Sequence, residues 1–294
     1  MWYNFFVEIL IEFENKPLFF NDQKEIICCS KLSDIPACFE KMEAALSKGY
    51  YLAGFLSYEA GYGFEDKLKS SKTFDFPLVH MGVYEKPGTG SPLPMGEGLG
   101  VRAKDINITE DKYFKNIERI REYIAAGDVY QITYCVKFNF DFDGNPFVLY
   151  KKLKKEQPVP YAAYLKDKDF SILSLSPELF IKKNNTHITT KPMKGTWPRG
   201  SNAWQDIWAG RALHKDPKNR AENIMICDLL RNDLGRIGSL VRAPKLFEVA
   251  KYLTLCQMTS TVTANVGRDI PLYKLFSSLH PSGSVTGAPK IRAM

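Results

Sequence analysis

A stretch rich in glycine and proline, residues 86–100, constrains the fold of this chain more than any other feature. Its sequence, KPGTGSPLPMGEGLG, places five glycines and three prolines in 15 residues, a density that no regular helix or strand accommodates. We therefore predict a linker or long loop over 86–100. It divides an N-terminal lobe, 1–100, from a larger region, 101–294, each long enough to have its own core.

Alternating and β-branched segments follow one another along the chain. Apolar residues at every second position predict one half-buried strand over 132–140. Further strands are predicted at 50–58, 161–165, 170–175, 178–182, 186–190 and 252–266. Runs of consecutive strands with a few helices between them predict an α+β fold with mainly antiparallel sheets.

Helices are indicated mainly by their ends. Ser33, Thr109 and Asp216 are typical N-cap residues, and Pro217 suits the first helical position. The predicted helices span 33–49, 109–127, 216–233 and 270–279, with another that begins at Asn145-Pro146. The lysines of 151–155 on that last helix are interpreted as a solvated face.

Composition excludes several classes of protein. Hydrophobic residues make up 45% and charged residues 25%, as in ordinary globular proteins. No apolar run approaches the about 18 residues of a membrane helix, and the first residues do not resemble a secretory signal, so we expect a cytoplasmic protein that has no membrane partner. The net charge of +7 is not concentrated in one segment, so no nucleic acid is expected as a partner, and the six cysteines are expected to stay reduced.

Two segments contain groups suited to acid–base or nucleophilic chemistry. Lys194 lies in KPMKGT, where proline and glycine favour an irregular backbone; it is either a solvated surface lysine or a nucleophilic amine whose pKa the site must lower. Glu178 lies in SPELF at the start of a predicted strand. It is either a surface carboxylate or a general acid whose pKa must be raised.

Two further segments indicate binding. Glu222 shares a predicted helical stripe with apolar residues at offsets of three, four and seven, where a carboxylate is costly unless it is paired or metal-bound. An internal salt bridge, with Arg220 or Arg231, competes with the metal interpretation. The loop PSGSVTGAPK, 281–290, ends at a predicted helix start that favours an anion, although it could also be a simple connection.

The order and spacing of SPELF, KPMKGT, DPKNRAENIMICDLLRNDLGRIG and HPSGSVTGAPKIRAM resemble the chorismate-utilising enzyme family over 109–294. A weaker resemblance covers 51–65. The resemblance implies a two-lobed fold like that of anthranilate synthase component I, with outer helices. It also implies that family members continue for several dozen residues beyond Met294. We therefore expect the fold to be incomplete at its C-terminus and turnover to be impaired.

Within the family, the sequence resembles the aminodeoxychorismate synthase branch, which has a lysine at the position of Lys194 where anthranilate synthases have alanine. Isochorismate and salicylate synthases have a water-activating lysine where this chain has Gln131. The resemblance implies that Lys194 attacks the chorismate ring and that Glu178 protonates the leaving hydroxyl. Ammonia from a glutamine amidotransferase subunit then displaces the lysine, a transaminase-class amination in folate and para-aminobenzoate synthesis.

The same resemblance implies Mg²⁺ as cofactor, with Glu222 as a metal ligand. Candidate substrate contacts are Thr286, Gly287, Lys290, Gln131, Gln257 and Thr196. Gln257 stands where the family usually has a histidine. The alternatives are anthranilate synthase component I, isochorismate or salicylate synthase, or an inactive fragment that only binds a glutaminase partner.

Overall fold

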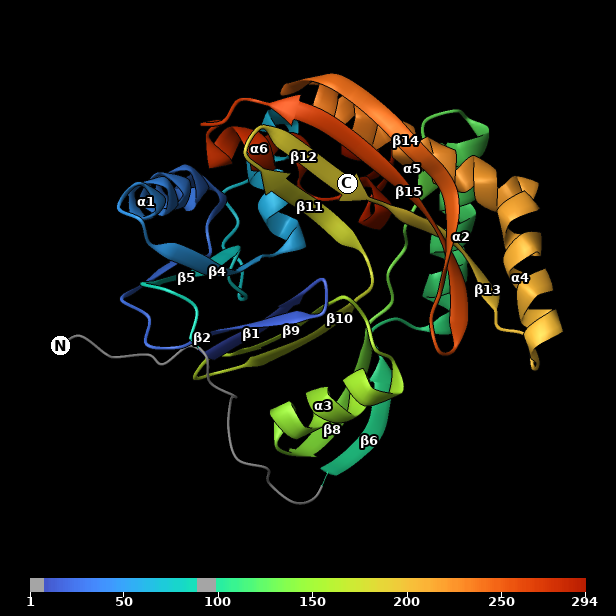
Figure 1. Ribbon diagram of the computed structural model, residues 1–294, viewed down its shortest axis with the longest axis horizontal. Coiled ribbons are helices and arrows are strands. Elements are labelled where there is room, and N and C mark those ends of the chain that lie inside the picture. Colours follow the sequence, from blue (N-terminus) through green and yellow to red (C-terminus); the bar gives the residue numbers. More distant parts are fainter. Residues whose placement is uncertain (1–7, 89–98) are drawn as a thin grey trace.

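The computed structural model describes residues 8–88 and 99–294, and it has the predicted α+β architecture with antiparallel sheets and outer helices (Figure 1). Most of the predicted linker, 89–98, lies outside the described residues. The division into two lobes at residue 100 therefore stays a prediction.

A small antiparallel sheet forms the first layer. Its strands, in spatial order, are β3 (Glu25–Cys29), β5 (Val79–Tyr84) and β4 (Tyr51–Leu56). Helix α1 (Ile35–Ser47), which lies within the predicted helix 33–49, covers this sheet and buries Phe39 and Met42. Three short 3-10 helices flank it: η1 (Leu32–Asp34), η2 (Tyr58–Phe64) and η3 (Asp66–Leu68).

A second sheet joins strands from both sides of residue 100. Its strands, in spatial order, are β10 (Ser171–Ser176), β9 (Tyr161–Lys166), β1 (Glu8–Phe13) and β2 (Lys16–Phe20). Helix α3 (Pro146–Glu156) packs against it, with Phe147 and Tyr150 buried beside Tyr164. The lysine-rich face of α3 stays partly or fully exposed, as predicted.

The largest sheet contains the strands that carry the candidate site. Its strands are β11 (Leu179–Asn184), β12 (His187–Lys191), β13 (Met193–Pro198), β14 (Gly238–Lys251) and β15 (Leu255–Val266). The long strand β15 pairs with β14 along one edge and with β12 and then β13 along the other. Consequently, β12 and β13 follow one another along the same edge.

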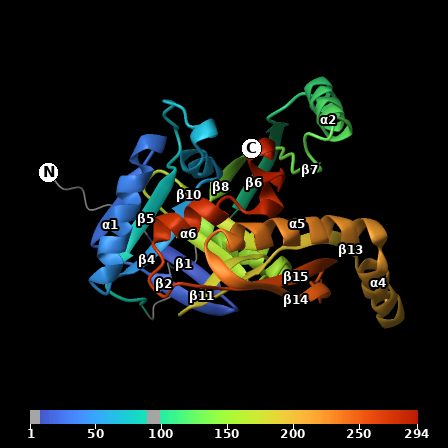
Figure 2. The same cartoon turned by 90° about the horizontal axis from the view of Figure 1, so that it is seen from above.

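Three helices support this sheet. Helix α5 (Pro217–Gly235) runs along its face, as Figure 2 shows from above. Helix α4 (Ala203–Lys215) lies near one end, and α6 (Leu272–Leu279) packs against both α5 and α1. Phe276 of α6 contacts Phe39 of α1, so α6 joins the large sheet to the first layer.

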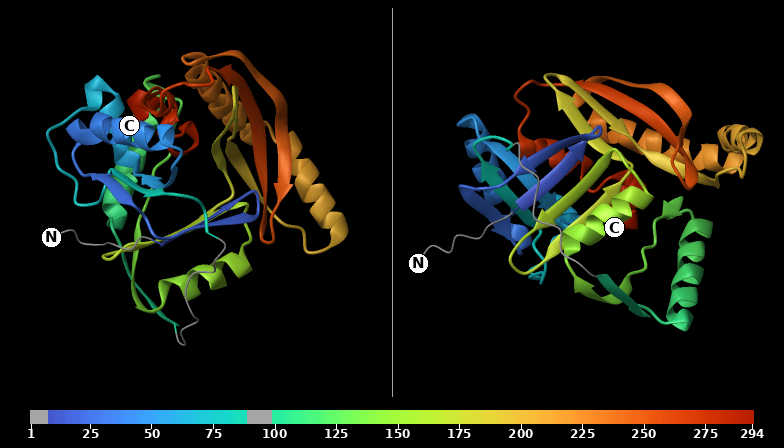
Figure 3. Two further views of the ribbon diagram at one scale, coloured as in Figure 1. Left: turned by 60° about the vertical axis from the view of Figure 1, so that its left-hand side comes forward. Right: turned by 60° about the horizontal axis from the view of Figure 1, so that its bottom comes forward.

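The strand pair β6 (Leu99–Ile106) and β8 (Phe138–Gly144) and helix α2 (Glu110–Ala125) lie at the periphery (Figure 3). The pair β7 (Gln131–Ile132) and β16 (Gly287–Ala288) lies further inside, where β16 contacts α5 and the short helix α7 (Lys290–Ala293). Helix α2 buries none of its residues, and the side chain of Phe138 on β8 is 70% exposed.

The prediction of one strand over 132–140 is wrong in its middle. Residues 133–137 are not a strand, because the two ends of the segment pair with different partners. β7 pairs with β16, whereas β8 pairs with β6. Alternation marks residues that suit a strand, but it does not specify which strand they pair with.

Candidate functional site

Lys194 lies on β13, at an irregular point of the strand. The register between β13 and β15 shifts between Met193 and Thr196, and Gly195 has a φ of +101°, a conformation that favours glycine. This local distortion agrees with the irregular backbone predicted from the sequence. The Lys194 side chain is partly buried, and its Nζ donates a hydrogen bond to Thr133 Oγ1 at 3.3 Å.

Glu178 lies immediately before β11, with its carboxylate facing the same region. The Ser284 hydroxyl donates to Glu178 Oε1 at 2.6 Å. Burial raises the pKa of Glu178 above its ordinary value, opposed by the Ser284 hydrogen bond, the charge of Lys194 and the Met193 backbone N–H. A carboxyl with a raised pKa is suited to donate a proton near neutral pH. The structure therefore brings Lys194 and Glu178 together.

Thr133 and the loop before β16 connect these two groups. The Thr133 hydroxyl donates to the Ser284 backbone oxygen at 3.3 Å, and the Thr133 backbone N–H donates to the Thr286 oxygen at 2.7 Å. The 3-10 helix η4 (Gly283–Val285) shapes this loop. These bonds hold Thr133 against the loop that contains Ser284 and Thr286, which lies far along the chain, and so place Lys194 and Glu178 on either side of this contact.

Thr286 and Gly287 form part of this scaffold. The Thr286 hydroxyl donates within its own loop, to the oxygens of Ser282 at 3.2 Å and Gly283 at 3.3 Å. A Cβ at Gly287 would lie 2.2 Å from the Gln131 backbone oxygen, so the β7–β16 contact requires glycine. These contacts give both residues a structural role; contact with a substrate stays a prediction.

Gln131 offers a buried side-chain acceptor that is unpaired within the described part of the chain. Its side-chain Oε1 is buried and has no hydrogen-bond partner among the described residues. A buried acceptor left unpaired is costly, and a ligand that donates a hydrogen bond would relieve that cost. Contact between Gln131 and a substrate stays a prediction.

Thr196 and Gln257 face each other across the β13–β15 pair. Gln257 Nε2 donates to Thr196 Oγ1 at 3.0 Å. The two predicted contact residues therefore act as one hydrogen-bonded pair, two residues along β13 from Lys194. An amide at position 257 can hold the Thr196 hydroxyl but cannot carry a proton at neutral pH.

Lys290 lies in a different environment from Lys194 and Glu178. Its Nζ pairs with Asp233 at 2.5 Å and donates to the oxygens of Ser278 and Leu279. Burial raises the pKa of Asp233 and lowers the pKa of Lys290, while their mutual attraction opposes both shifts. Both residues line a cavity of about 380 Å³ near the end of the described chain. The structure thus gives Lys290 three intramolecular partners, and substrate contact there stays a prediction.

The predicted core-facing position of Glu222 is wrong. Its side chain is 35% exposed, and its nearest cation is Lys218 at 3.9 Å rather than Arg220 or Arg231. Arg231 pairs with Asp228 instead. The buried stripe of α5 is one residue out of phase with the predicted one, and its members are Asn223, Ile226, Cys227, Leu230, Asp233 and Leu234.

The residue that the sequence pattern missed is Asn223, whose side chain is only 1% exposed. Its Nδ2 donates to the backbone oxygens of Lys194 at 3.2 Å and Met258 at 3.4 Å, and its Oδ1 accepts from the Ser260 hydroxyl at 2.5 Å. Asn223 therefore holds the backbone of Lys194 against β15. The only signal in the sequence is a polar residue directly beside Glu222 on a helix that leads into an apolar run.

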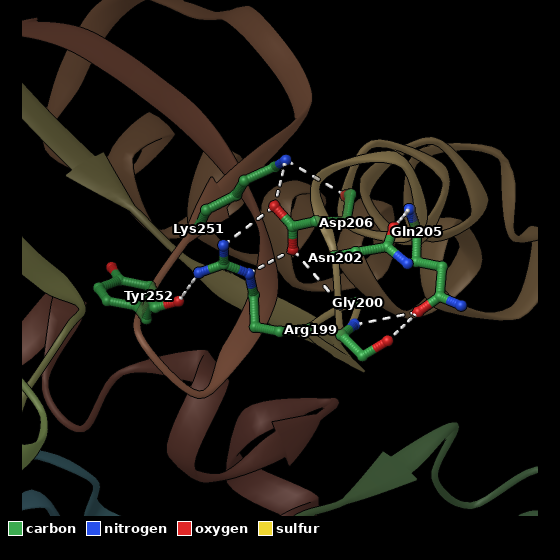
Figure 4. Close-up of polar contacts among 8 residues, drawn as sticks. Arg199, Gly200, Asn202, Gln205, Asp206, Lys251 and Tyr252 are labelled. Carbon is green, nitrogen blue, oxygen red and sulfur yellow. Dashed lines mark hydrogen bonds and ion pairs between the residues drawn. The ribbon is translucent and has the colours of Figure 1, made fainter.

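A second polar cluster, also missed, fixes the far end of β13 (Figure 4). Asp206 on α4 accepts from Arg199 Nη2 at 2.9 Å and from Lys251 Nζ at 2.8 Å, and Arg199 also donates to the Tyr252 backbone oxygen. Arg199 and then Lys251 hold the pKa of Asp206 well below its usual range. The cluster ties the end of the strand that bears Lys194 to α4 and to the β14–β15 turn.

Glu222 is suited to contribute one ligand to a metal ion. Among residues 8–88 and 99–294, no group of three or more histidine, cysteine, aspartate or glutamate side chains could hold a metal. Mg²⁺, however, usually takes one or two protein carboxylates and completes its shell with water and substrate oxygens. The partly exposed Glu222 carboxylate, with only a distant lysine partner, fits that limited role.

With the fold and the positions of Lys194 and Glu178 described, comparison with known proteins gives the family of the chain. The sequence profile of the family described as "chorismate binding enzyme" matches residues 91–294. The chain therefore belongs to the chorismate-binding enzyme family. No helix in the described part of the chain is long and apolar enough to cross a membrane.

Similar proteins agree with this assignment. The chain is 37% identical to aminodeoxychorismate synthase component 1 of Salmonella typhimurium over 190 residues, which cover 64% of this chain and 42% of the relative. It is 34% identical to anthranilate synthase component 1 of Thermus thermophilus over 208 residues, or 69% of this chain and 45% of that one. The matches thus span less than half the length of these relatives.

A solved structure confirms the fold. The crystal structure of anthranilate synthase component I from Streptococcus pneumoniae superimposes with a TM-score of 0.72 at 23% sequence identity. The match covers 100% of this chain and 76% of that one. The predicted likeness to the anthranilate synthase component I fold is therefore confirmed.

Proposed function

We propose that this chain contains the chorismate-aminating site of an aminodeoxychorismate synthase component 1, with Lys194 as nucleophile and Glu178 as general acid. The observation that carries the proposal is the junction of these groups: the Lys194 amine bonds to Thr133, Thr133 bonds to Ser284, and Ser284 bonds to Glu178. The relatives named aminodeoxychorismate synthase component 1 support it.

The proposed chemistry proceeds in two displacements. The neutral Lys194 amine forms a C–N bond to the chorismate ring as the ring C–O bond breaks, and Glu178 gives its proton to the departing hydroxyl, which leaves as water. The substituted amine then loses its extra proton to solvent. In the second displacement, ammonia forms a C–N bond to the ring while the C–N bond to Lys194 breaks. The lysine nitrogen takes up a proton as it leaves and the new ammonium group loses one, which yields 4-amino-4-deoxychorismate and the free Lys194 amine. Because hydroxide is a poor leaving group, the acid is essential to the first displacement.

Other residues of the site would orient the reactants. Gln131 Oε1, buried without a partner, would accept a hydrogen bond from the substrate or from ammonia. Glu222 would hold Mg²⁺, which offsets the charge of a dicarboxylate substrate when bound. A glutamine amidotransferase subunit would supply the ammonia, as an expected partner of this branch.

Covalent labelling tests the proposal without requiring full turnover. The unaltered chain is incubated with chorismate and Mg²⁺ without ammonia, and intact-protein and peptide mass spectrometry locate the adduct. We expect an adduct on Lys194, its loss in Lys194→Ala, and its release by added ammonium as aminodeoxychorismate. Lys191→Ala is the matched control, because Lys191 is an exposed lysine on the adjoining strand β12.

Two results would contradict the proposal. If Lys194→Ala aminates chorismate at the rate of the unaltered chain, Lys194 is not the nucleophile. If the product is fluorescent anthranilate, or if product forms without ammonia, the chain belongs to another branch of the family. Calorimetry with chorismate separates an enzyme from a fragment that only binds a partner subunit.

A further inference from the structure

Two serine hydroxyls lie in line behind the carboxylate of Glu178. The Ser284 hydroxyl donates to Glu178 Oε1 at 2.6 Å, and the oxygens of Ser282 and Ser284 lie 3.0 Å apart. Ser284 is 5% exposed, whereas Ser282 is more exposed and lies nearer to solvent. We propose that Ser282 and Ser284 form a proton relay that returns a proton from solvent to Glu178 after each reaction cycle.

The need for such a relay rests on the proposed function. A general acid that gives up its proton must regain it before the next substrate reacts. Glu178 is only partly exposed, and the Ser284 hydroxyl occupies one of its carboxylate oxygens, so water has limited access to the carboxylate. Its other neighbours, the Met193 N–H and Lys194, donate hydrogen bonds or positive charge and favour the ionised form.

A route from Lys194 is interrupted. Lys194 donates to the Thr133 hydroxyl, but Thr133 in turn donates to the backbone oxygen of Ser284. A carbonyl oxygen accepts hydrogen bonds and has no proton to pass on, whereas a serine hydroxyl both donates and accepts. Among the hydrogen bonds of the described residues, the Ser282–Ser284 pair therefore gives Glu178 a continuous hydroxyl path.

The relay balances as a transfer of one proton. The Glu178 carboxylate takes the proton of the Ser284 hydroxyl, Ser284 takes that of Ser282, and Ser282 takes one from solvent. No bond between heavy atoms changes, and both hydroxyls then rotate back. The starting arrangement is the one observed, with Ser284 donating to the carboxylate.

The backbone around the relay is held in place. The Ser282 backbone oxygen accepts from the Thr286 hydroxyl at 3.2 Å and from the Val285 N–H at 3.1 Å. The Ser284 oxygen accepts from Thr133. These bonds use backbone oxygens only, so both side-chain hydroxyls stay available for the relay. They also place the two hydroxyls without relying on their mutual hydrogen bond.

If the two serines only stabilised the loop, the alanine variants would show different kinetics. Loss of either hydroxyl would then lower the stability of the fold and affect every phase of the reaction equally. A relay predicts that the first covalent event, which uses a proton already on Glu178, keeps its rate. The slowing falls on later cycles, which wait for Glu178 to be reprotonated.

The test compares burst and steady-state phases in the unaltered chain, Ser282→Ala, Ser284→Ala and Ser284→Thr, with chorismate, Mg²⁺ and ammonium. We expect both alanine variants to slow later cycles about tenfold or more while the burst persists. Ser284→Thr, which keeps a hydroxyl, should restore the rate. The control is Ser277→Ala, because the Ser277 hydroxyl donates to the backbone oxygen of Lys274 in its own helix and to no other group in the described part of the chain.

A second readout needs no substrate. Carbon-13 NMR of Glu178, assigned with Glu178→Gln, follows its pKa directly. Ser284→Ala should raise this pKa further, because it removes a donor to the carboxylate, whereas Ser284→Thr should not.

The outcomes separate the two proposals. An adduct on Lys194 together with unchanged later cycles in both alanine variants overturns the relay alone. No adduct in the unaltered chain overturns the proposed function and the relay with it. Equal slowing of burst and later cycles assigns the two serines a structural role and also overturns the relay.

Discussion

Replacing Asn223 by alanine tests how much of the site depends on one buried amide. The change removes donors to the backbone oxygens of Lys194 and Met258 and an acceptor for the Ser260 hydroxyl. A buried hydrogen bond contributes a net of about 1 kcal/mol, and a buried group left unpaired costs about 1–3 kcal/mol. The Ser260 hydroxyl still accepts a hydrogen bond from the Phe247 N–H. Most of the free-energy cost therefore comes from the backbone oxygens of Lys194 and Met258, which lose their donor.

We therefore expect Asn223→Ala to lower the free energy of unfolding by about 3 kcal/mol, a large part of the about 5–15 kcal/mol of a typical domain. Urea unfolding followed by circular dichroism measures the loss, with an unchanged m-value as the sign that two-state behaviour holds. The matched control is Asn232→Ala, because Asn232 is an exposed asparagine on the same helix. It should change stability by less than about 0.5 kcal/mol.

A conservative variant sharpens the test. Asn223→Asp keeps the acceptor for Ser260 but faces two carbonyl oxygens with a carboxylate, so it should destabilise at least as much as alanine. The reasoning fails if Asn223→Ala costs less than about 1 kcal/mol, or if it matches the control on the exposed side of α5.

Three further predictions concern the site and its periphery. Glu178→Gln should raise the melting temperature at pH 7. Folding raises the pKa of Glu178, so the stability of the unaltered chain declines as pH rises through the raised pKa. The gain in melting temperature from the glutamine should therefore shrink as pH falls. Gly287→Ala should destabilise by about 1–3 kcal/mol in urea, because the new Cβ would lie 2.2 Å from the Gln131 oxygen, whereas Gly235→Ala, with open space around it, should cost much less. Phe138→Lys should change the free energy of unfolding in urea by less than about 0.5 kcal/mol, because Phe138 is 70% exposed on β8; a loss of more than about 1 kcal/mol would contradict this.

The sequence specifies the local boundaries of this fold well. The Thr109 hydroxyl accepts from the Lys112 N–H, and the Asp216 carboxylate accepts from the Asn219 N–H, as their N-cap positions predict. Short strands between 161 and 191 also lie where their alternation and turns place them. These features depend on a few neighbouring residues, which is the information that a single sequence contains.

Features that depend on distant partners were predicted less well. The segment 133–137 leaves the strand conformation because its two ends join different sheets, and no local pattern encodes those partners. The register of α5 was also missed, because hydrophobicity alone places a polar Asn223 outside and moves Glu222 inward. Asn223 is buried only because two backbone oxygens of the sheet lie opposite its amide.

The same contrast separates the residues that would react from the residues that position them. Lys194 and Glu178 stand out in the sequence because the motifs around them, KPMKGT and SPELF, resemble those of the family. Ser284 and Asn223 are ordinary polar residues, and their roles follow only from the groups that they face. Neutral groups suit this role, because a hydroxyl or amide can hold a charged neighbour without adding a charge that would repel the dianionic substrate of the proposed function. Variants that add charge at 223 or 284 should therefore harm chorismate binding more than alanine variants do, which calorimetry of Ser284→Asp against Ser284→Ala measures directly.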